Sequence, residues 1–214
     1  MLRRPGRLLL LAAVALILLL VVGGALTGLY TDALWYAGVG YGGVYWTRLA
    51  TTAAVRLVVG GLGAAFVALN LWFVARQVGP VQLRRRYGNL EIAEQVPRRY
   101  ITLGILAVAV LAGWWLSGIP FDGGGALTIL AWLRHVPWGA TDPLFGHDLS
   151  FYVFELPAFD RLADFALLLL LWTLLLVLLG YILAGGVRVR DGRLEVESTP
   201  RLHFVVLAAG LVLL

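Results

Sequence analysis

Four long apolar runs divide the chain, and charged residues are almost absent from each of them. The runs cover residues 8–29, 57–74, 101–118 and 165–184. A helix needs about 20 apolar residues to cross about 30 Å of hydrocarbon, so each run is near the required length. The pattern predicts an all-α fold, a polytopic transmembrane helical bundle with four complete spans.

A fifth apolar run, residues 203–214, is much shorter than the other four. As a helix it covers about 18 Å, which is too little to cross a bilayer alone. A natural chain end there would leave backbone carbonyls without partners in hydrocarbon, which is costly. We therefore expect a truncated fifth span in a fragment of a longer protein, and we treat residues 1–214 as a single membrane domain.

The longest connection between the runs, residues 119–164, carries local helix signals. Residues 126–138 form an apolar helix pattern that is too short to cross, which suits a helix at the membrane interface. Asp142 before Pro143 resembles a helix N-cap followed by proline at the first helical position, and Asp148 is a candidate cap for the next turn. The connection is therefore expected to hold short helices rather than an open loop.

The start of the fourth span shows similar local signals. Pro157 suits the first turn of the helix that leads into this span. Asp160 and Asp164 are expected near the N-terminal end of that helix, where its dipole favours negative charge.

Small residues recur at helical spacing in three of the runs. Such positions allow two helix backbones to approach closely in a membrane. They are Gly24 with Gly28, Gly60 with Ala64 and Ala68, and Ala109 with Gly113. We expect close helix packing at these faces.

All seventeen basic residues are arginines, and their distribution predicts the orientation of the chain. Thirteen lie before the first run or in the connections of residues 75–100 and 185–202. Four lie in the other two connections, residues 30–56 and 119–164. Because basic residues collect on the cytoplasmic side, the N-terminus and the arginine-rich connections are predicted to be cytoplasmic and the other two extracytoplasmic.

Arg56 lies directly before the second apolar run. If the helix begins at Leu57, the run of residues 57–74 still covers about 27 Å. The guanidinium of Arg56 could then extend outward to water. We therefore expect Arg56 to lie at a helix end rather than inside a span.

The composition supports a membrane protein and excludes several kinds of chemistry. Hydrophobic residues make up 61% of the chain and the mean hydropathy is +0.88, far above the usual range of soluble domains. Cysteine and lysine are both absent, which excludes disulfides, thiolate catalysis, Schiff bases and a P-loop lysine. The formal charge of +5 does not indicate a nucleic-acid partner, because the arginines flank apolar runs instead of forming one soluble face.

Gly38, Gly40 and Gly43 match the G-x-G-x-x-G spacing of dinucleotide-binding loops. Such a site also needs a preceding strand, a following helix and an acidic residue about 20 positions on, and none is evident. The glycines are better explained by a turn after the first span. No cofactor is predicted.

Five arginines of the second connection are candidate contacts for anionic lipid headgroups. They are Arg84, Arg85, Arg86, Arg98 and Arg99. Retention of this connection in the cytoplasm requires the same charges, so membrane orientation explains them equally well.

The acidic residues of the third connection allow a second interpretation besides capping. Asp142, Asp148, Glu155 and Asp160 could form a calcium site or an acid–base pair. Their spacing matches no EF-hand loop, and His147 has no metal-ligand or nucleophile partner at a defined spacing. Capping of helices and turns is the favoured explanation, and no metal site or catalytic residue is predicted.

A family resemblance rests on residues of the first and third connections. Those of the first are Tyr30, Asp32, Leu34, Trp35, Tyr36, Gly40 and Tyr41. Those of the third, our candidate interaction motif, are Asp142, Pro143, Phe145, Gly146, Asp148, Phe151, Tyr152, Phe154 and Pro157, with Thr141 and Leu156 alongside. The chain resembles uncharacterised protein family UPF0182 over essentially its whole length.

The resemblance implies a multipass protein of the bacterial plasma (inner) membrane. Members of the family continue through more helices into a long extracytoplasmic portion, which this chain lacks. No activity is settled for the family, so the resemblance supplies no catalytic residue.

Three hypotheses for function follow. The first is a structural or envelope-associated membrane module whose aromatic-rich outer connections form a lid that docks the missing downstream region. The second is part of a transporter or channel, although Asn70 is the one strongly polar amide in the apolar runs, which disfavours an ion relay within them. The third, an extracytoplasmic enzyme acting on lipid or cell wall, has the least support.

Overall fold

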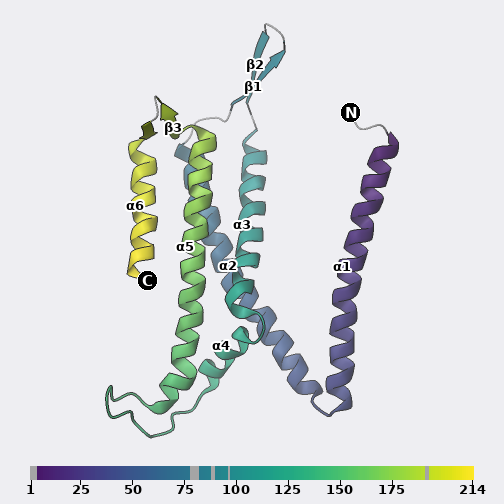
Figure 1. The fold of residues 1–214 in the computed structure, drawn as a ribbon, viewed down its shortest axis with the longest axis vertical. Coiled ribbons are helices and arrows are strands. Elements are labelled where there is room, and N and C mark those ends of the chain that lie inside the picture. Colours follow the sequence, from purple (N-terminus) through teal and green to yellow (C-terminus); the bar gives the residue numbers. More distant parts are fainter. Residues whose placement is uncertain (1–3, 78–81, 88–89, 96, 191–192) are drawn as a thin grey trace. The chain divides into compact units, whose positions relative to one another are not determined.

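The computed structural model describes residues 4–77, 82–87, 90–95, 97–190 and 193–214, and Figure 1 shows it as a ribbon. The described residues form mainly helices. These are α1 (Arg4–Gly38), α2 (Gly42–Gln77), α3 (Arg98–Phe121), α4 (Gly125–Arg134), the π-helical segment η1 (Phe151–Glu155), α5 (Leu156–Ala184) and α6 (Ser198–Leu213).

Four helical stretches are long and apolar enough to cross a membrane. They are Leu8–Gly38, Gly42–Gln77, Arg98–Phe121 and Phe151–Ala184. The helices α4 and α6 are apolar but shorter, and α6 coincides with the fifth apolar run. The predicted all-α helical membrane bundle is confirmed.

Two β-hairpins, which the apolar pattern did not predict, join the helices. Strand β1 (Gln82–Tyr87) pairs antiparallel with β2 (Leu90–Gln95), and β3 (Val187–Arg190) pairs antiparallel with β4 (Arg193–Val196). They occupy the two arginine-rich connections. Among the described residues of these connections, those of the four strands are therefore paired in antiparallel ladders.

The chain divides into two compact units, Met1–Ala50 and Thr51–Leu214. In the first, α1 and the beginning of α2 are joined by a turn at residues 39–41. Gly40 adopts a φ of 83°, which glycine accepts without strain, so the turning role predicted for the glycines is confirmed. The hydroxyl of Tyr45 donates to the Leu29 carbonyl at 2.8 Å across this helical hairpin.

The predicted first connection, residues 30–56, contains the ends of two long helices. It is helical except for the turn, because no proline interrupts the helices on either side of the glycines. α1 has 35 residues and α2 has 36, about 50 Å each, so both helices exceed the thickness of the hydrocarbon.

In the second unit, α5 contributes to both hydrophobic clusters. Near one end, Val177 and Tyr181 pack with Val74 of α2, Val187 of β3 and Leu207 of α6. Toward the other end, Phe165 belongs to a cluster with residues of α3 and α4, which are Leu116, Phe121 and Ala126.

α2 and α3 approach closely through small residues. A Cβ added to Gly113 of α3 would meet the carbonyl oxygen of Gly60 and lie 2.7 Å from the amide nitrogen of Ala64, both on α2. Close packing is therefore confirmed at this face. Gly24 and Gly28 belong to the first unit, within which a Cβ added at either position would meet nothing within 4 Å.

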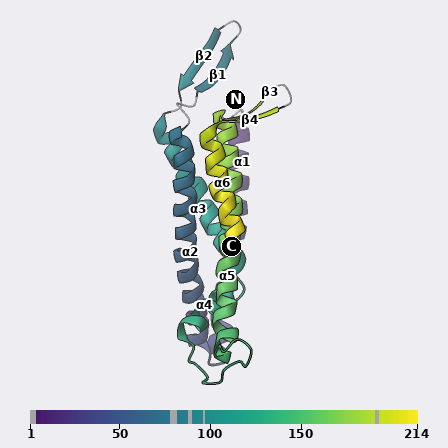
Figure 2. The ribbon, with the colours of Figure 1, turned by 90° about the vertical axis from the view of Figure 1, so that its left-hand side faces the viewer.

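Within the second unit, connections of different kinds lie at opposite ends of the helices (Figure 2). Both β-hairpins lie at one end, and α4 with the segment leading to α5 lies at the other. This arrangement follows from successive helices running in alternate directions.

Candidate functional site

Asp142 organises a tight turn in the third connection. Its Oδ2 accepts hydrogen bonds from the Phe145 amide at 2.8 Å and the Tyr152 hydroxyl at 3.0 Å, and its Oδ1 accepts from the Leu144 amide at 3.3 Å. These bonds, led by that from Phe145, lower the pKa of Asp142 below its usual value. The side chain is therefore ionised at neutral pH.

The predicted helix N-cap at Asp142 is wrong, because residues 143–145 form a turn instead of a helix. Gly146 has a φ of 71°, and its amide donates to the Asp142 carbonyl at 2.9 Å, which reverses the chain. Thr141 then pairs with Asp148 in an isolated antiparallel bridge. The Asp142 side chain thus accepts backbone amide hydrogen bonds as predicted, but in a turn and not at the start of a helix.

Asp148 caps the following helix and also fixes the preceding chain. Its Oδ1 accepts from the Ser150 amide at 2.8 Å and the Trp138 amide at 3.1 Å, while Oδ2 accepts from the Gly139 amide at 2.8 Å. Hydrogen bonds from Ser150, then Trp138 and Gly139, lower the pKa of Asp148 to about 2. The predicted capping role is confirmed, and its bonds to residues 138 and 139 could not be expected from local sequence.

The aromatic residues of the candidate interaction motif pack largely within the connection itself. Phe151 stacks on His147 with ring centroids 4.5 Å apart. Phe154 contacts His135 at 5.7 Å and Trp138 at 5.9 Å between centroids. These aromatic side chains are therefore half-buried and help to hold the connection in one shape.

Pro157 is the second residue of α5, so its predicted place in the first turn of this helix is confirmed. α5 is itself the continuation of a longer helical stretch. The stretch begins at residue 149 and passes through η1 into α5. Proline has no amide hydrogen to donate to the preceding turn and its ring crowds that turn, so a wider π-turn before it relieves both problems. Asp160 and Asp164 are the fifth and ninth residues of α5, near its N-terminal end but beyond the first turn, where the dipole effect is strongest.

The acidic residues of this connection do not converge. Asp142 and Asp148 bind separate sets of amides, Glu155 lies 3.4 Å from His135 Nε2, and Asp160 is exposed on α5. Among the described residues, no group of three or more His, Cys, Asp and Glu side chains could hold a metal ion.

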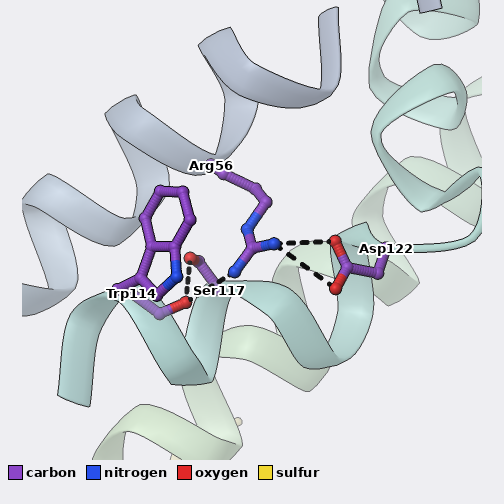
Figure 3. Close-up of polar contacts among 4 residues, drawn as sticks. All are labelled: Arg56, Trp114, Ser117 and Asp122. Atoms are coloured by element: carbon purple, nitrogen blue, oxygen red, sulfur yellow. Dashed lines mark hydrogen bonds and ion pairs between the residues drawn. The ribbon is translucent and has the colours of Figure 1, made fainter. Parts of the chain in front are cut away.

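An ion pair between helices was missed by the sequence analysis (Figure 3). Arg56 lies within α2 and not at its start, so its predicted place at a helix end is wrong. Its Nη1 donates to Asp122 Oδ1 at 3.0 Å, and its Nη2 donates to the Trp114 carbonyl of α3 at 3.1 Å. The guanidinium also lies 4.2 Å from the Trp114 ring centroid.

A second polar network joins α2, α5 and α6. Asn70 Oδ1 lies 2.8 Å from His203 Nε2, and the Tyr181 hydroxyl lies 3.2 Å from His203 Nδ1. Asn70 Nδ2 donates to the Phe66 carbonyl at 2.8 Å, so its Oδ1 faces the histidine as an acceptor. A neutral His203 with hydrogen on Nε2 satisfies all three side chains.

The candidate lipid-binding arginines are placed only in part. Arg84, Arg85 and Arg86 lie on β1, but their side chains are outside the described residues. Arg98 and Arg99 are exposed in the first turn of α3, where Arg99 donates to the Tyr100 hydroxyl at 3.3 Å. No arrangement specific for a lipid headgroup follows from these positions.

The four long apolar helices define a polytopic helical membrane protein. A family model described as Uncharacterised protein family (UPF0182) matches residues 9–214, and the chain therefore belongs to this family. The resemblance carried by the motifs of the first and third connections is thus confirmed.

Relatives from several bacteria match nearly the whole chain. A UPF0182 protein of Desulfitobacterium hafniense is 28% identical over 99% of this chain and 23% of its own length. One of Cupriavidus necator is 33% identical over 88% of this chain and 20% of its own length, and one of Mycobacterium tuberculosis is 30% identical over 100% and 22%. The chain thus spans about a fifth of the length of these relatives. No solved structure matches it.

Proposed function

We propose that the chain is a structural, envelope-associated module of the bacterial plasma membrane, with its N-terminus in the cytoplasm. The lid is the part of the third connection (residues 119–164) that lies between α3 and α5, residues 122–155, and it docks a further extracytoplasmic part of the same polypeptide. The length of the relatives supports this proposal, because about four fifths of each lies outside the matched region. In the first connection, residues 30–56, the aromatic residues lie on the ends of α1 and α2 around the turn at residues 39–41.

The observation that carries the proposal is the exposed apolar surface of the lid. Its members are Leu133, Val136, Leu144 and Phe145, which are 69%, 71%, 78% and 70% exposed. Several large apolar side chains exposed on one ordered segment outside the predicted spans are a feature of interaction sites. Asp142, His147 and Asp148 border Leu144 and Phe145 in sequence, which favours an aqueous partner surface over hydrocarbon for this turn.

Cysteine accessibility tests the docking, since the chain has no native cysteine. Leu144→Cys should react rapidly with a water-soluble maleimide in the purified 214-residue chain. In native membranes, where the whole polypeptide is present, we expect at least tenfold slower labelling. Ala140→Cys, an exposed control on the same lid, should react equally in both. Equal labelling of Leu144→Cys in the two preparations would refute docking.

The proposed orientation has its own test. Ala140→Cys should be labelled from outside intact cells by a reagent that does not cross the membrane. Gly88→Cys, in the arginine-rich second connection, should be labelled only after the cells are permeabilised. The reverse pattern would overturn the topology and with it the outer position of the lid.

A second candidate function is part of a transporter, and the Asn70–His203–Tyr181 network favours it. Polar side chains from three apolar helices meet there, and in membrane proteins such groups often mark an ion or proton pathway. Liposomes that contain the whole polypeptide should then show a proton or cation flux that His203→Leu abolishes. Absence of flux in the wild-type protein would leave a packing role for the network.

Catalysis by the acids of the lid has less support. The low pKa values of Asp142 and Asp148 make either a poor proton donor near neutral pH, and both carboxylates already bind backbone amides. Asp142→Asn and Asp148→Asn should therefore weaken the fold of the lid. Loss of an enzymatic activity with normal folding would instead identify catalytic acids.

A further inference from the structure

The lid contains an open groove with an aromatic lining and one carboxylate. It has a volume of about 510 Å³. Its lining residues are Trp138, Asp142, Phe145, Leu149, Tyr152 and Val153. Small-molecule sites are commonly apolar concavities with a few polar groups that fix the ligand, and this groove has the apolar lining and a polar group but is shallow and open on one side.

The carboxylate of Asp142 is ionised and retains acceptor capacity. Among the described residues, Oδ1 has the Leu144 amide as its hydrogen-bond donor, at the long distance of 3.3 Å. A carboxylate oxygen can accept two hydrogen bonds, so a ligand can approach this atom. Within the described chain no arginine forms an ion pair with Asp142, and its carboxylate lines an apolar groove, although the charge of His147 also acts on this carboxylate and lowers its pKa.

We propose that this groove binds an organic ammonium group that carries apolar substituents. Trp138, Phe145 and Tyr152 supply aromatic rings to the lining, whose faces can attract such a cation, and Asp142 supplies the opposite full charge. The alkyl substituents replace water along Leu149 and Val153. Either an amine headgroup of a phospholipid or a free amine has this chemistry.

Other ligand classes fit the groove less well. A calcium ion requires six to eight oxygen ligands, whereas the groove offers one carboxylate and one phenol. An anion would be repelled by Asp142. A neutral apolar ligand would gain nothing from the carboxylate, so only a cation uses both features of the lining.

Choline and 3,3-dimethylbutanol test the proposal, because they have nearly the same shape and differ in charge. The 214-residue chain would be placed in nanodiscs of phosphatidylglycerol, which has no amine, and binding of each probe measured by saturation-transfer NMR. We expect choline to bind at least tenfold more tightly than the alcohol. Equal affinities would overturn the proposal.

Two variants and one control assign the binding to the groove. Asp142→Asn removes the charge and one of the two acceptor oxygens, and should weaken choline binding at least fivefold; unchanged binding of the alcohol shows that the lid is still folded in this variant. Phe145→Leu keeps apolar bulk without an aromatic face, and should weaken choline but not the alcohol. Asp160→Asn, an exposed acid outside the groove, should change neither. Unchanged choline binding in Asp142→Asn would contradict the proposed site.

Nanodiscs of phosphatidylethanolamine distinguish the two sources of the ammonium group. If the lipid headgroup is the ligand, these nanodiscs should suppress choline binding in the wild-type chain. If choline binds equally in both lipids, a free amine is the ligand of the same site. The inference goes beyond the docking role, and the purified chain tests it whether or not the lid is covered in the whole polypeptide.

Discussion

Two polar networks lie between apolar helices of the bundle, and their polar side chains are satisfied in different ways. The Arg56–Asp122 pair is charged, and its carboxylate side chain is 57% exposed although the arginine side chain is only 17% exposed. The Asn70–His203–Tyr181 network is satisfied without charge, and Tyr181 is 1% exposed. The comparison indicates that a charge is kept where one partner reaches solvent, whereas neutral groups suffice in the interior.

Their positions along α2 explain the difference. Arg56 meets the end of α3, where Asp122 follows the last helical residue. Asn70 lies further along the same helix and meets α6 between aromatic side chains, with Phe73 5.1 Å from the His203 ring centroid. α2 therefore contributes a residue to each network, and variants can show whether the two networks are independent.

The largest effect is expected where α2 and α3 touch. In Gly113→Ala the added methyl group would collide with the backbone of α2 at Gly60 and Ala64. We expect a loss of about 3 kcal/mol, because backbone cannot move aside as a side chain can. Unfolding in mixed detergent micelles measures it. Gly104→Ala, where a Cβ meets nothing within 4 Å, should be neutral or slightly stabilising.

Gly113→Ala should also separate the two networks. It moves α3 away from Arg56 but leaves α2, α5 and α6 in contact around His203. We expect the His203 ring NMR signals to keep their wild-type shifts while the Arg56 side-chain signals change. Equal disturbance of both sets would show that the networks are one cooperative unit.

Removal of Asp122 should have the next largest effect. Asp122→Ala leaves the mostly buried guanidinium of Arg56 without its carboxylate, at a cost of about 2 kcal/mol. Arg56→Met removes the buried charge and leaves an exposed carboxylate that water can solvate, so it should cost less. The same unfolding measurement compares them. A larger loss for Arg56→Met would contradict the assigned asymmetry.

The neutral network should couple more weakly. A double-mutant cycle of Asn70→Ala and His203→Ala should give a coupling of about 0.6 kcal/mol and no more than about 1.7 kcal/mol, as for other hydrogen bonds between membrane helices. Tyr181→Phe, which removes one hydroxyl, should cost a similar amount. A coupling near zero would mean that the 2.8 Å contact between Asn70 and His203 contributes no stability.

Much of the architecture could be predicted from the sequence because it depends on local hydrophobicity. Four apolar runs are enough to give four long helices. The extent of these helices could not be predicted in the same way, since α1 and α2 continue through polar residues until the glycines at 38 to 42 interrupt them. The hairpin β3–β4 had a signal, the alternation Val-Arg-Val-Arg followed by Asp-Gly, which the search for apolar runs ignores.

The polar contacts divide by sequence separation. Asp148 and Ser150 are two residues apart, and this capping bond could be predicted. Arg56 and Asp122 are 66 residues apart, and Asn70 and His203 are 133 apart, so only the packed helices bring them together. For Asp142 the local hydrogen bonds could be predicted but the structure that they stabilise could not. The same bonds occur at a helix N-terminus and in a turn, and the positive φ of Gly146 produces the turn.

The smallest effect is expected for Asp148, a charged residue of the lid that lies outside the two networks of the bundle. The pKa of Asp148 is about 2 in the folded lid, below its ordinary value of 3.8. The contribution of its carboxylate to the stability of the lid is therefore fully present above about pH 4 and is lost as the pH falls toward 2. The NMR shift of the Gly139 amide should titrate over this range. Asp148→Asn should abolish that titration, and a midpoint near 4 would show that the carboxylate does not hold this amide.

The wide turn of five residues before α5 has a consequence for the angular position of the lid. A π-helical turn such as η1 holds one residue more than an α-helical turn. Because an α-helix rotates by about 100° for each residue, this extra residue changes the rotation of the lid about the axis of the fourth span. Loss of one residue between 151 and 155 would swing Trp138 and Phe145 around that axis by more than a quarter of a revolution. The direction in which Trp138 and Phe145 lie relative to the fourth span thus depends on the one extra residue of η1.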